Sequence, residues 1–386
     1  MASCAHQQWL RLNRDDNGFV LQYGNRLDNI ANSIPRPAKQ WPSLILFLGK
    51  QSKAKALRAM FPGNGVSSCR RPGLANVCVD PATVSDDHPF LIADWCPEQT
   101  LANQRDSGAC HEAITHPVAW SDDDGPPTQH DVMDHIQMRL LSLFTNVLCI
   151  FAQDFGGLDQ VAERLASWTA TGSASSLPAS THPRLVVVTS IPGPGFRSEA
   201  LCFRLRVLAD PKFSGSFSSL QVVNVLGPSR APARVHLSAL GAVLREEAAA
   251  ARAERVNTHT LFSMIHLAAF FDAALRDFAG LPRHTFDFIR CAREDNPVSA
   301  SFQRHVASLM SLGSEKKVPG TILWEFIASA IIMDSFPPDM HRKCSPPALC
   351  VPLTRSSLQS IRSLPNLLSP TLPPQHPRFC RRPTSV

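Results

Sequence analysis

The chain reads LILFLGKQSKAKAL from Leu44 to Leu57, and this stretch decides the fold class. The apolar run 44–48 predicts a buried strand, because it contains no polar residue for an exposed face. The lysines and alanines that follow Gly49 predict a helix. A strand, a glycine-containing turn and a helix in this order are the setting of the phosphate-binding loop.

Residues 49–56 align with the eight-residue phosphate-loop pattern G-x-x-x-x-G-K-[ST] and match two of its four fixed positions. Gly49 takes the first place and Lys55 the lysine place, whereas Ala54 and Ala56 replace the second glycine and the hydroxyl residue. The Cβ atom of Ala54 would make a positive φ cost about 1–2 kcal/mol. Ala56 has no oxygen for Mg²⁺. The pattern therefore indicates a degenerate loop.

Three lysines nevertheless make this loop strongly positive. Lys50, Lys53 and Lys55 lie at the start of a predicted helix, where free N–H groups also favour an anion. The residues that we expect to contact a nucleotide are Gly49, Lys50, Lys53, Ala54, Lys55 and Ala56. The alternative is an ordinary strand, turn and helix whose lysines are solvated.

Apolar runs of about five residues recur at long intervals, with helical patterns between most of them. They lie at 44–48, 75–79, 90–94, 146–151, 185–189 and 221–226. Near-continuous apolar strands suit a sheet that is covered on both faces, and their alternation with helices favours parallel pairing. The sequence thus predicts an α/β fold with a mainly parallel, P-loop NTPase-like sheet of five or six strands.

Composition divides the chain into four regions. We expect an N-terminal extension 1–40, a degenerate P-loop NTPase-like α/β domain 41–230, a helical region 231–341 and a disordered basic tail 342–386 that is rich in Pro and Ser. The tail holds seven of the 38 Lys and Arg residues and no acidic residue, which leaves 31 basic against 32 acidic residues elsewhere. The remaining chain is about neutral and lacks the charge pattern of a specific nucleic-acid-binding protein.

Two acidic residues follow predicted strands. Asp94 ends the third strand, where phosphate-loop enzymes carry a carboxylate that holds Mg²⁺; the alternative is that it caps the next turn. Asp154 follows the fourth strand, and we expect it to be the N-cap of a helix from Gly157. The stretch 170–183 is a predicted long loop, which is either functional or disordered.

Cysteine usage and hydropathy bear on the compartment. The eleven cysteines form no C-x-x-C pair, and their number is odd. No apolar run reaches about 18 residues, and the N-terminus lacks the apolar core of a secretory signal. We therefore expect a reducing, cytoplasmic location and no transmembrane segment.

The order of strands and helices resembles that of a small GTPase-like P-loop domain. The amino-acid sequence is also similar to the P-loop region of large fungal multidomain proteins that carry a patatin-like phospholipase domain. The stretches that carry this resemblance are Leu44–Pro62, Asn146–Trp168 and Ile322–His341. The resemblance covers about residues 40–341 and implies a P-loop module followed by helices. It implies no lipase activity, because the sequence has no glycine-rich oxyanion motif and no nucleophile elbow.

These observations lead to two functional expectations. The first is a degenerate, GTPase- or ATPase-like regulatory module with little or no hydrolysis. It would bind GTP or ATP with Mg²⁺, with Lys55 on the phosphate and Asp94 facing the metal position. The second is a non-enzymatic protein–protein interaction scaffold that retains only the fold. Its partner would contact apolar helical faces of 260–278 and 322–336, unless the chain buries them itself.

Overall fold

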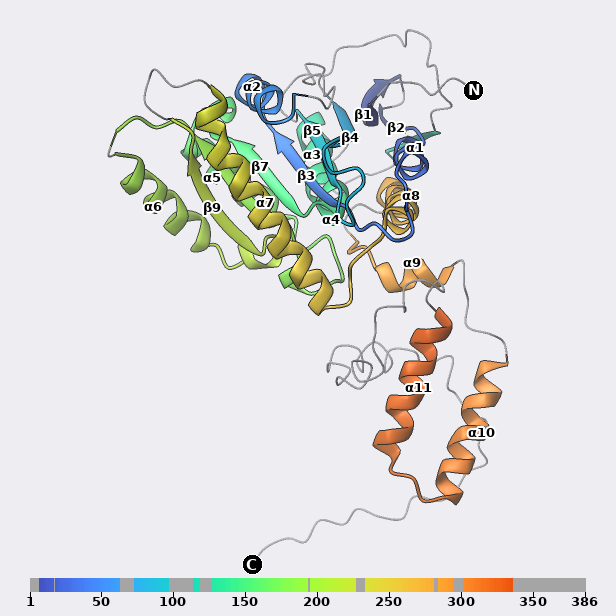
Figure 1. Ribbon diagram of the computed structural model, residues 1–386. Coiled ribbons are helices and arrows are strands. Elements are labelled where there is room, and N and C mark those ends of the chain that lie inside the picture. The colour runs from blue at the N-terminus through green and yellow to red at the C-terminus, as the bar shows by residue number, and fades with distance from the viewer. Residues whose placement is uncertain are drawn as a thin grey trace, which may run out of the picture. The chain divides into compact units, whose positions relative to one another are not determined.

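The computed structural model places most of the chain in regular elements (Figure 1). It describes residues 7–16, 18–62, 73–96, 114–118, 127–193, 195–226, 233–280, 284–294 and 301–335. The chain divides into two compact units, Met1–Phe288 and Ile289–Val386. The predicted tail 342–386 lies outside the described residues.

The strands all belong to one sheet. They are β1 (Gln8–Asp15), β2 (Gly18–Tyr23), β3 (Ser43–Leu48), β4 (Leu74–Val79), β5 (Phe90–Trp95), β6 (Ile114–Pro117), β7 (Val147–Phe151), β8 (Arg184–Thr189) and β9 (Ser219–Asn224). Their order is β6-β2-β1-β4-β5-β3-β7-β8-β9. The strands β5, β3, β7, β8 and β9 run parallel, whereas β6, β2, β1 and β4 form an antiparallel extension of the sheet.

Helices connect the strands and continue after them. They are α1 (Arg26–Ser33), α2 (Gln51–Met60), α3 (Gln129–His135), α4 (Ser142–Phe144), α5 (Leu158–Ala170), α6 (Gly195–Leu208), α7 (Ala233–Asn257), α8 (Met264–Gly280), α9 (Phe288–Glu294), α10 (Phe302–Glu315) and α11 (Gly320–Ser335). A π-helical segment, η1 (Ile136–Leu141), joins α3 to α4. Short 3₁₀ turns form η2 (Ala152–Phe155), η3 (Ala179–Thr181) and η4 (Phe213–Gly215).

The α/β class is confirmed, but the prediction of a mainly parallel sheet of five or six strands is wrong. All six predicted strands form, as β3, β4, β5, β7, β8 and β9. Within the described residues the sheet has nine strands, because β1, β2 and β6 extend it beyond β4 with antiparallel pairs. These strands mix polar and apolar residues, so they lack the continuous apolar runs of the parallel strands.

A turn signal in the sequence marks the strands that the prediction missed. Asp15 pairs with Gly18 at the end of the β1–β2 hairpin, and Gly18 has a φ of +133°. Asn-Gly between two alternating segments, as at 17–18 of the sequence, is the strongest short-range indication of a hairpin. The segment 1–40 thus supplies two strands to the same sheet as the predicted domain 41–230.

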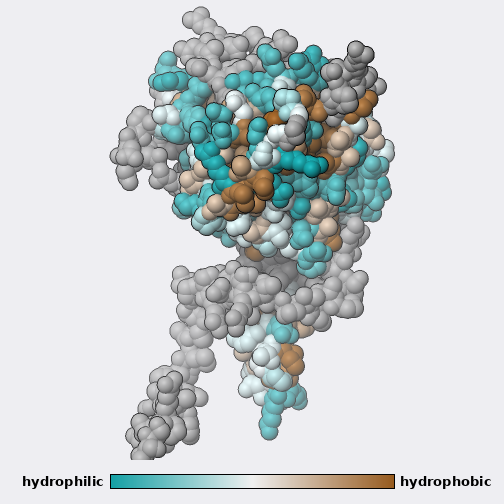
Figure 2. Space-filling view, turned by 90° about the vertical axis from the view of Figure 1, so that its left-hand side faces the viewer, coloured by the Kyte–Doolittle hydropathy of each residue, from teal (hydrophilic) through white to brown (hydrophobic). Residues whose placement is uncertain are grey.

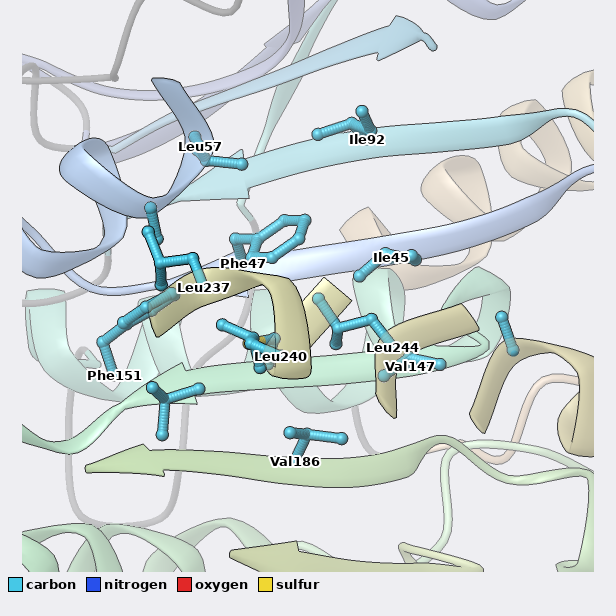
Figure 3. Packing of buried hydrophobic residues seen from close by; sticks show 14 of the residues in the cluster. Ile45, Phe47, Leu57, Ile92, Val147, Phe151, Val186, Leu237, Leu240 and Leu244 are labelled. Atoms are coloured by element: carbon cyan, nitrogen blue, oxygen red, sulfur yellow. The ribbon is translucent and has the colours of Figure 1, made fainter. Parts of the chain in front are cut away.

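The helices α2 and α7 cover one face of the sheet. Figure 3 shows Leu237, Leu240 and Leu244 of α7 pointing at side chains of β3, β7 and β8. Cys149 belongs to the same cluster and is fully buried, and this burial raises the pKa of its thiol. It therefore acts as a small apolar side chain. Because α7 lies on the sheet, the first unit continues past the predicted boundary at 230.

Aromatic contacts tie α8 to the opposite side of the sheet. The ring of Phe271 lies 4.7 Å from that of Trp9 and 5.5 Å from that of Phe144, measured between centroids. Most large apolar side chains of α8 are buried in this way. The chain itself therefore covers the apolar face that the sequence predicted at 260–278, and Trp9 brings the first strand into the same core.

The second unit contains the helix pair α10 and α11. A Cβ atom on Gly313 of α10 would lie 2.5 Å from Cδ1 of Leu323 of α11, so the glycine permits a close approach of the two helices. Ile322, Trp324 and Phe326 of α11 remain exposed. Within the described residues, no helix of either unit combines the length and the apolar character that a membrane crossing requires.

Removing one leucine from α7 tests whether its packing on the sheet stabilises the first unit. Leu240 is fully buried, and we expect Leu240→Ala to lower the free energy of unfolding by about 2–5 kcal/mol through lost burial and a cavity. Val235 of the same helix is 59% exposed, so Val235→Ala should change it by less than about 0.5 kcal/mol. Urea unfolding followed by tryptophan fluorescence measures both. Equal effects would contradict the packing of α7 described above.

Candidate functional site

The connection between β3 and α2 is shorter than a phosphate-binding loop. β3 ends at Leu48 and α2 begins at Gln51, so only Gly49 and Lys50 lie between them. A phosphate-binding loop places its whole G-x-x-x-x-G-K-[ST] frame between strand and helix. Here the last four places of the frame are the third to sixth residues of α2. Alanine in place of the second glycine favours this early helix, because it is the best helix former.

The start of α2 is capped by a carboxylate from a distant part of the sequence. Oδ2 of Asp154 accepts hydrogen bonds from the backbone N–H groups of Lys50 at 2.6 Å and Lys53 at 3.0 Å. Oδ1 accepts one from the N–H of Ser52 at 3.0 Å. Asp154 lies in η2 directly after β7, and β7 pairs with β3. The carboxylate satisfies orphan N–H groups and complements the positive end of the helix dipole.

Gly49 permits this close approach. Its φ is +145°, in the region that favours glycine. A Cβ atom here would lie 2.6 Å from Oδ2 of Asp154 and 3.2 Å from Cβ of Lys53. The glycine that the sequence predicts as the opening of a phosphate loop therefore makes room for a side chain of the same protein.

Lys53 and Asp94 form a buried ion pair beside the cap. Nζ of Lys53 lies 3.5 Å from Oδ2 of Asp94 and donates a hydrogen bond of 3.0 Å to the carbonyl of Trp95. Both charged side chains are 0% exposed. Nδ2 of Asn76 donates to Oδ1 of Asp94 at 3.1 Å. Each oxygen of the carboxylate predicted to face Mg²⁺ thus has a partner from the protein.

The remaining residues of the predicted site lie apart from this pair. Lys55 is exposed on α2, and Lys53 supplies the ammonium group at Asp94. Ala54 and Ala56 are buried, and Ala56 belongs to the core cluster between α2 and the sheet. The structure therefore brings together Gly49, Lys50, Lys53 and Asp94, with Asp154 as an additional member.

The sequence prediction for Asp154 was wrong. Gly157 precedes α5, and no side chain caps this helix. Gly156 and Gly157 have φ angles of +97° and +122°, in the region that favours glycine, and so form the turn before α5. Asp154 instead caps a helix about a hundred residues earlier in the chain. The signal was its place at the carboxyl end of a strand, because the carboxyl ends of adjacent parallel strands meet at one edge of the sheet.

Most of the polar groups described above at this edge of the sheet, within the described residues, are already bound to other groups of the protein. No group of three His, Cys, Asp or Glu side chains there could hold a metal ion. The N–H groups at the start of α2 already bind an anion, and the buried lysine is neutralised by Asp94. Comparison with protein-family models and with curated proteins finds no match for the chain.

Replacing each of two lysines in α2 tests which one the fold depends on. We expect Lys53→Met to lower the free energy of unfolding by about 3–5 kcal/mol, because it leaves the Asp94 carboxylate buried without its counter-charge. Lys55→Met removes an exposed charge from the same helix and should cost less than about 0.5 kcal/mol. Urea unfolding compares the two variants. The double variant Lys53→Met, Asp94→Asn should recover part of the loss, and a larger loss for Lys55→Met would contradict the assignment.

Proposed function

We propose that the first unit is a non-enzymatic protein–protein interaction scaffold that retains an α/β fold without nucleotide turnover. The observation that carries this proposal is the Asp154 carboxylate, which lies 2.6–3.0 Å from three N–H groups at the start of α2. A nucleotide phosphate would need the same donors. The protein thus supplies internally the anion that a substrate would otherwise provide.

The neighbouring charges support the same proposal. Lys53 is fully buried against Asp94, so its ammonium group cannot reach a phosphate in solvent without breaking that pair. Ala56 lies in the core and offers no hydroxyl for Mg²⁺. Hydrolysis of GTP or ATP would need both a metal ligand and a charge on the terminal phosphates. Ala56 thus supplies no metal ligand, and Lys53 supplies no charge unless its pair with Asp94 breaks.

A partially apolar stripe on α6 is the surface that we assign to a partner. Leu201, Leu205 and Leu208 are 57%, 63% and 50% exposed, and their spacing of four and three residues puts them on one side of the helix. Arg197 and Arg204 are exposed on the same side. We call these five residues the α6 stripe.

The setting of the α6 stripe favours a particular partner chemistry. The helix α6 packs beside β9, the last strand of the sheet, and Figure 2 shows hydrophobic and hydrophilic residues interspersed on the side of the molecule where these elements lie. Leucines flanked by arginines complement a helix with an apolar face and acidic residues beside it. The partner that we propose is therefore an acidic amphipathic helix.

The nucleotide-binding module remains a second candidate because the N–H groups at the start of α2 form an anion-binding arrangement. Three N–H groups converge on one carboxylate, which shows that the backbone here can hold an anion. Binding of GTP or ATP with Mg²⁺ would require Asp154 to leave. The affinity of such a module would therefore rise when Asp154 is removed.

Isothermal titration with nucleotides distinguishes the two candidates. For the scaffold, we expect no heat of binding with 1 mM ATP or GTP, with or without Mg²⁺, for the parent or for Asp154→Ala. Asp159→Ala is the matched control, because it removes an exposed carboxylate from α5. Binding by the parent would overturn the scaffold proposal. Binding only by Asp154→Ala would support an original phosphate site that the carboxylate closes.

A synthetic acidic amphipathic helix tests the α6 stripe directly. The probe is a fluorescently labelled helical peptide with leucines on one face and glutamates on the other. We expect it to bind the parent, and we expect Leu205→Asp to weaken this binding at least tenfold. Val256 of α7 is 52% exposed, so Val256→Asp introduces the same charge outside the stripe and should leave binding unchanged. Fluorescence anisotropy measures the affinity. Equal weakening by both variants, or no binding by the parent, would exclude the stripe as the surface.

A further inference from the structure

A small pocket with both polar and apolar lining lies at the opposite edge of the sheet from Asp154. Its lining includes Thr181 and His182, which precede β8, and Ser216, which precedes β9. Arg255 enters from the last turns of α7. The pocket has a volume of about 20 Å³, on a scale where one water molecule needs about 10–15 Å³. It therefore suits one small group and is too small for a nucleoside.

Arg255 is the most unusual member of this pocket. Its side chain is 5% exposed, and burial lowers its pKa to about 10. The guanidinium lies 5.9 Å from the ring centroid of Phe262, and one Nη makes a long contact of 3.5 Å with the carbonyl of Thr181. Its Nε–H has no hydrogen-bond partner among the described residues. No carboxylate lines the described pocket, so this buried charge has no counter-charge there.

Two further polar side chains in the pocket are buried with hydrogen-bonding capacity that the protein does not use. His182 is 8% exposed, and neither ring nitrogen has a partner at full hydrogen-bond geometry among the described residues, although the nearby Leu177 backbone raises the pKa of the ring. Ser216 is 6% exposed, and its hydroxyl is likewise unpaired within that part of the chain. Buried polar groups are almost always hydrogen-bonded in native proteins, by protein or by a bound species. Three such groups around one pocket point to a ligand.

The chemistry of the three side chains defines the ligand class. A guanidinium group, an imidazole ring and a hydroxyl group can all donate hydrogen bonds, and arginine is the residue best suited to bind planar or tetrahedral oxyanions. We propose that the pocket binds a single oxyanion of the phosphate or sulfate class through Arg255, His182 and Ser216. The anion supplies the missing negative charge and accepts the hydrogen bonds that these side chains lack.

The protonation of His182 couples this binding to pH. Burial lowers the pKa of His182, and the positive charge of Arg255 lowers it further, whereas the carbonyl of Leu177 opposes these effects. Arg139 brings a further positive charge close to the described pocket, because it donates to the carbonyls of Gly172, which lines the pocket, and Ser173. An anion beside His182 favours the protonated ring. Binding therefore takes up a proton, and the affinity should rise as the pH falls.

Thermal unfolding in sulfate and phosphate tests the site on the intact chain. At constant ionic strength, we expect 20 mM of either anion to raise the Tm of the parent by at least about 2 °C. Arg255→Met should abolish this rise and leave the Tm in anion-free buffer equal or higher, because it removes an uncompensated buried charge. Arg245→Met is the matched control, since Arg245 is an exposed arginine of the same helix, and it should keep the rise.

Two results would overturn the proposal. One is a parent whose Tm does not respond to either anion, and the other is an Arg255→Met variant that responds as strongly as the parent. Sulfate is used for the pH comparison because it stays a dianion from pH 6 to pH 8. Its affinity for the parent should increase toward pH 6, and His182→Asn should remove this pH dependence. A parent whose affinity falls toward pH 6 would exclude the role of His182.

A comparison of free and esterified phosphate identifies the source of the anion. If glycerol phosphate raises the Tm as much as inorganic phosphate does, the pocket binds the phosphate group of a small ester. If only inorganic phosphate acts, the pocket binds the free ion. Both results support an oxyanion site, whereas the absence of a response to both contradicts it. None of these results depends on the interaction surface at α6, which uses different residues.

Discussion

The carboxylate of Asp154 holds the start of α2 at the carboxyl edge of the parallel strands. It follows β7 in the chain, yet its oxygens bind the N–H groups at the start of α2, which follows β3. One side chain thus connects the end of β7 to the start of the helix that follows the neighbouring strand, β3. Gly49 makes this possible because it has no Cβ atom to collide with the carboxylate. Three N–H groups in an anion-binding arrangement thus bind a carboxylate of the protein itself.

The buried pair of Lys53 and Asp94 follows from the same arrangement. Because α2 begins only two residues after β3, Lys53 faces the end of β5 from the first turn of the helix. Removing both charges from water is expensive, and the pair stabilises the fold only as long as both members are present. Asn76 and the Trp95 carbonyl satisfy the remaining hydrogen-bonding groups of this pair. The charged groups of this pair are therefore held by defined partners within the protein.

The parts of the fold that could be predicted are those with a local signal. The strands β3, β7 and β8 are continuous apolar runs, and such runs indicate a strand buried on both faces. The strands β1 and β2 mix polar and apolar residues, so they were missed although the sequence carries the hairpin signal Asn17-Gly18. The π-helical segment 136–141 has no equivalent signal, because it differs from an α-helix only in its hydrogen bonding.

The candidate site shows a second limit of sequence reasoning. Gly49 was expected at the right place, but the frame assigned the phosphate contact to Lys55, and the lysine that faces Asp94 is Lys53. The error arose because the start of α2 cannot be read from spacing when alanine replaces glycine. The contact between Asp154 and the helix start depends on which strands are neighbours, and that is a property of the whole sheet. The unpaired groups around Arg255 are invisible to any motif for the same reason.

The cap that Asp154 forms also determines what sequence changes at the start of α2 can do. Glycine at position 54 and serine at position 56 would complete the letters of the phosphate-loop pattern, yet the Asp154 carboxylate would still bind the N–H groups of Lys50, Ser52 and Lys53. Whether the N–H groups at this helix start are open to a ligand thus depends on a residue about a hundred positions away from the turn itself. The sequence pattern of the turn and the accessibility of its donors are set by different parts of the chain, so a change in one leaves the other as it is.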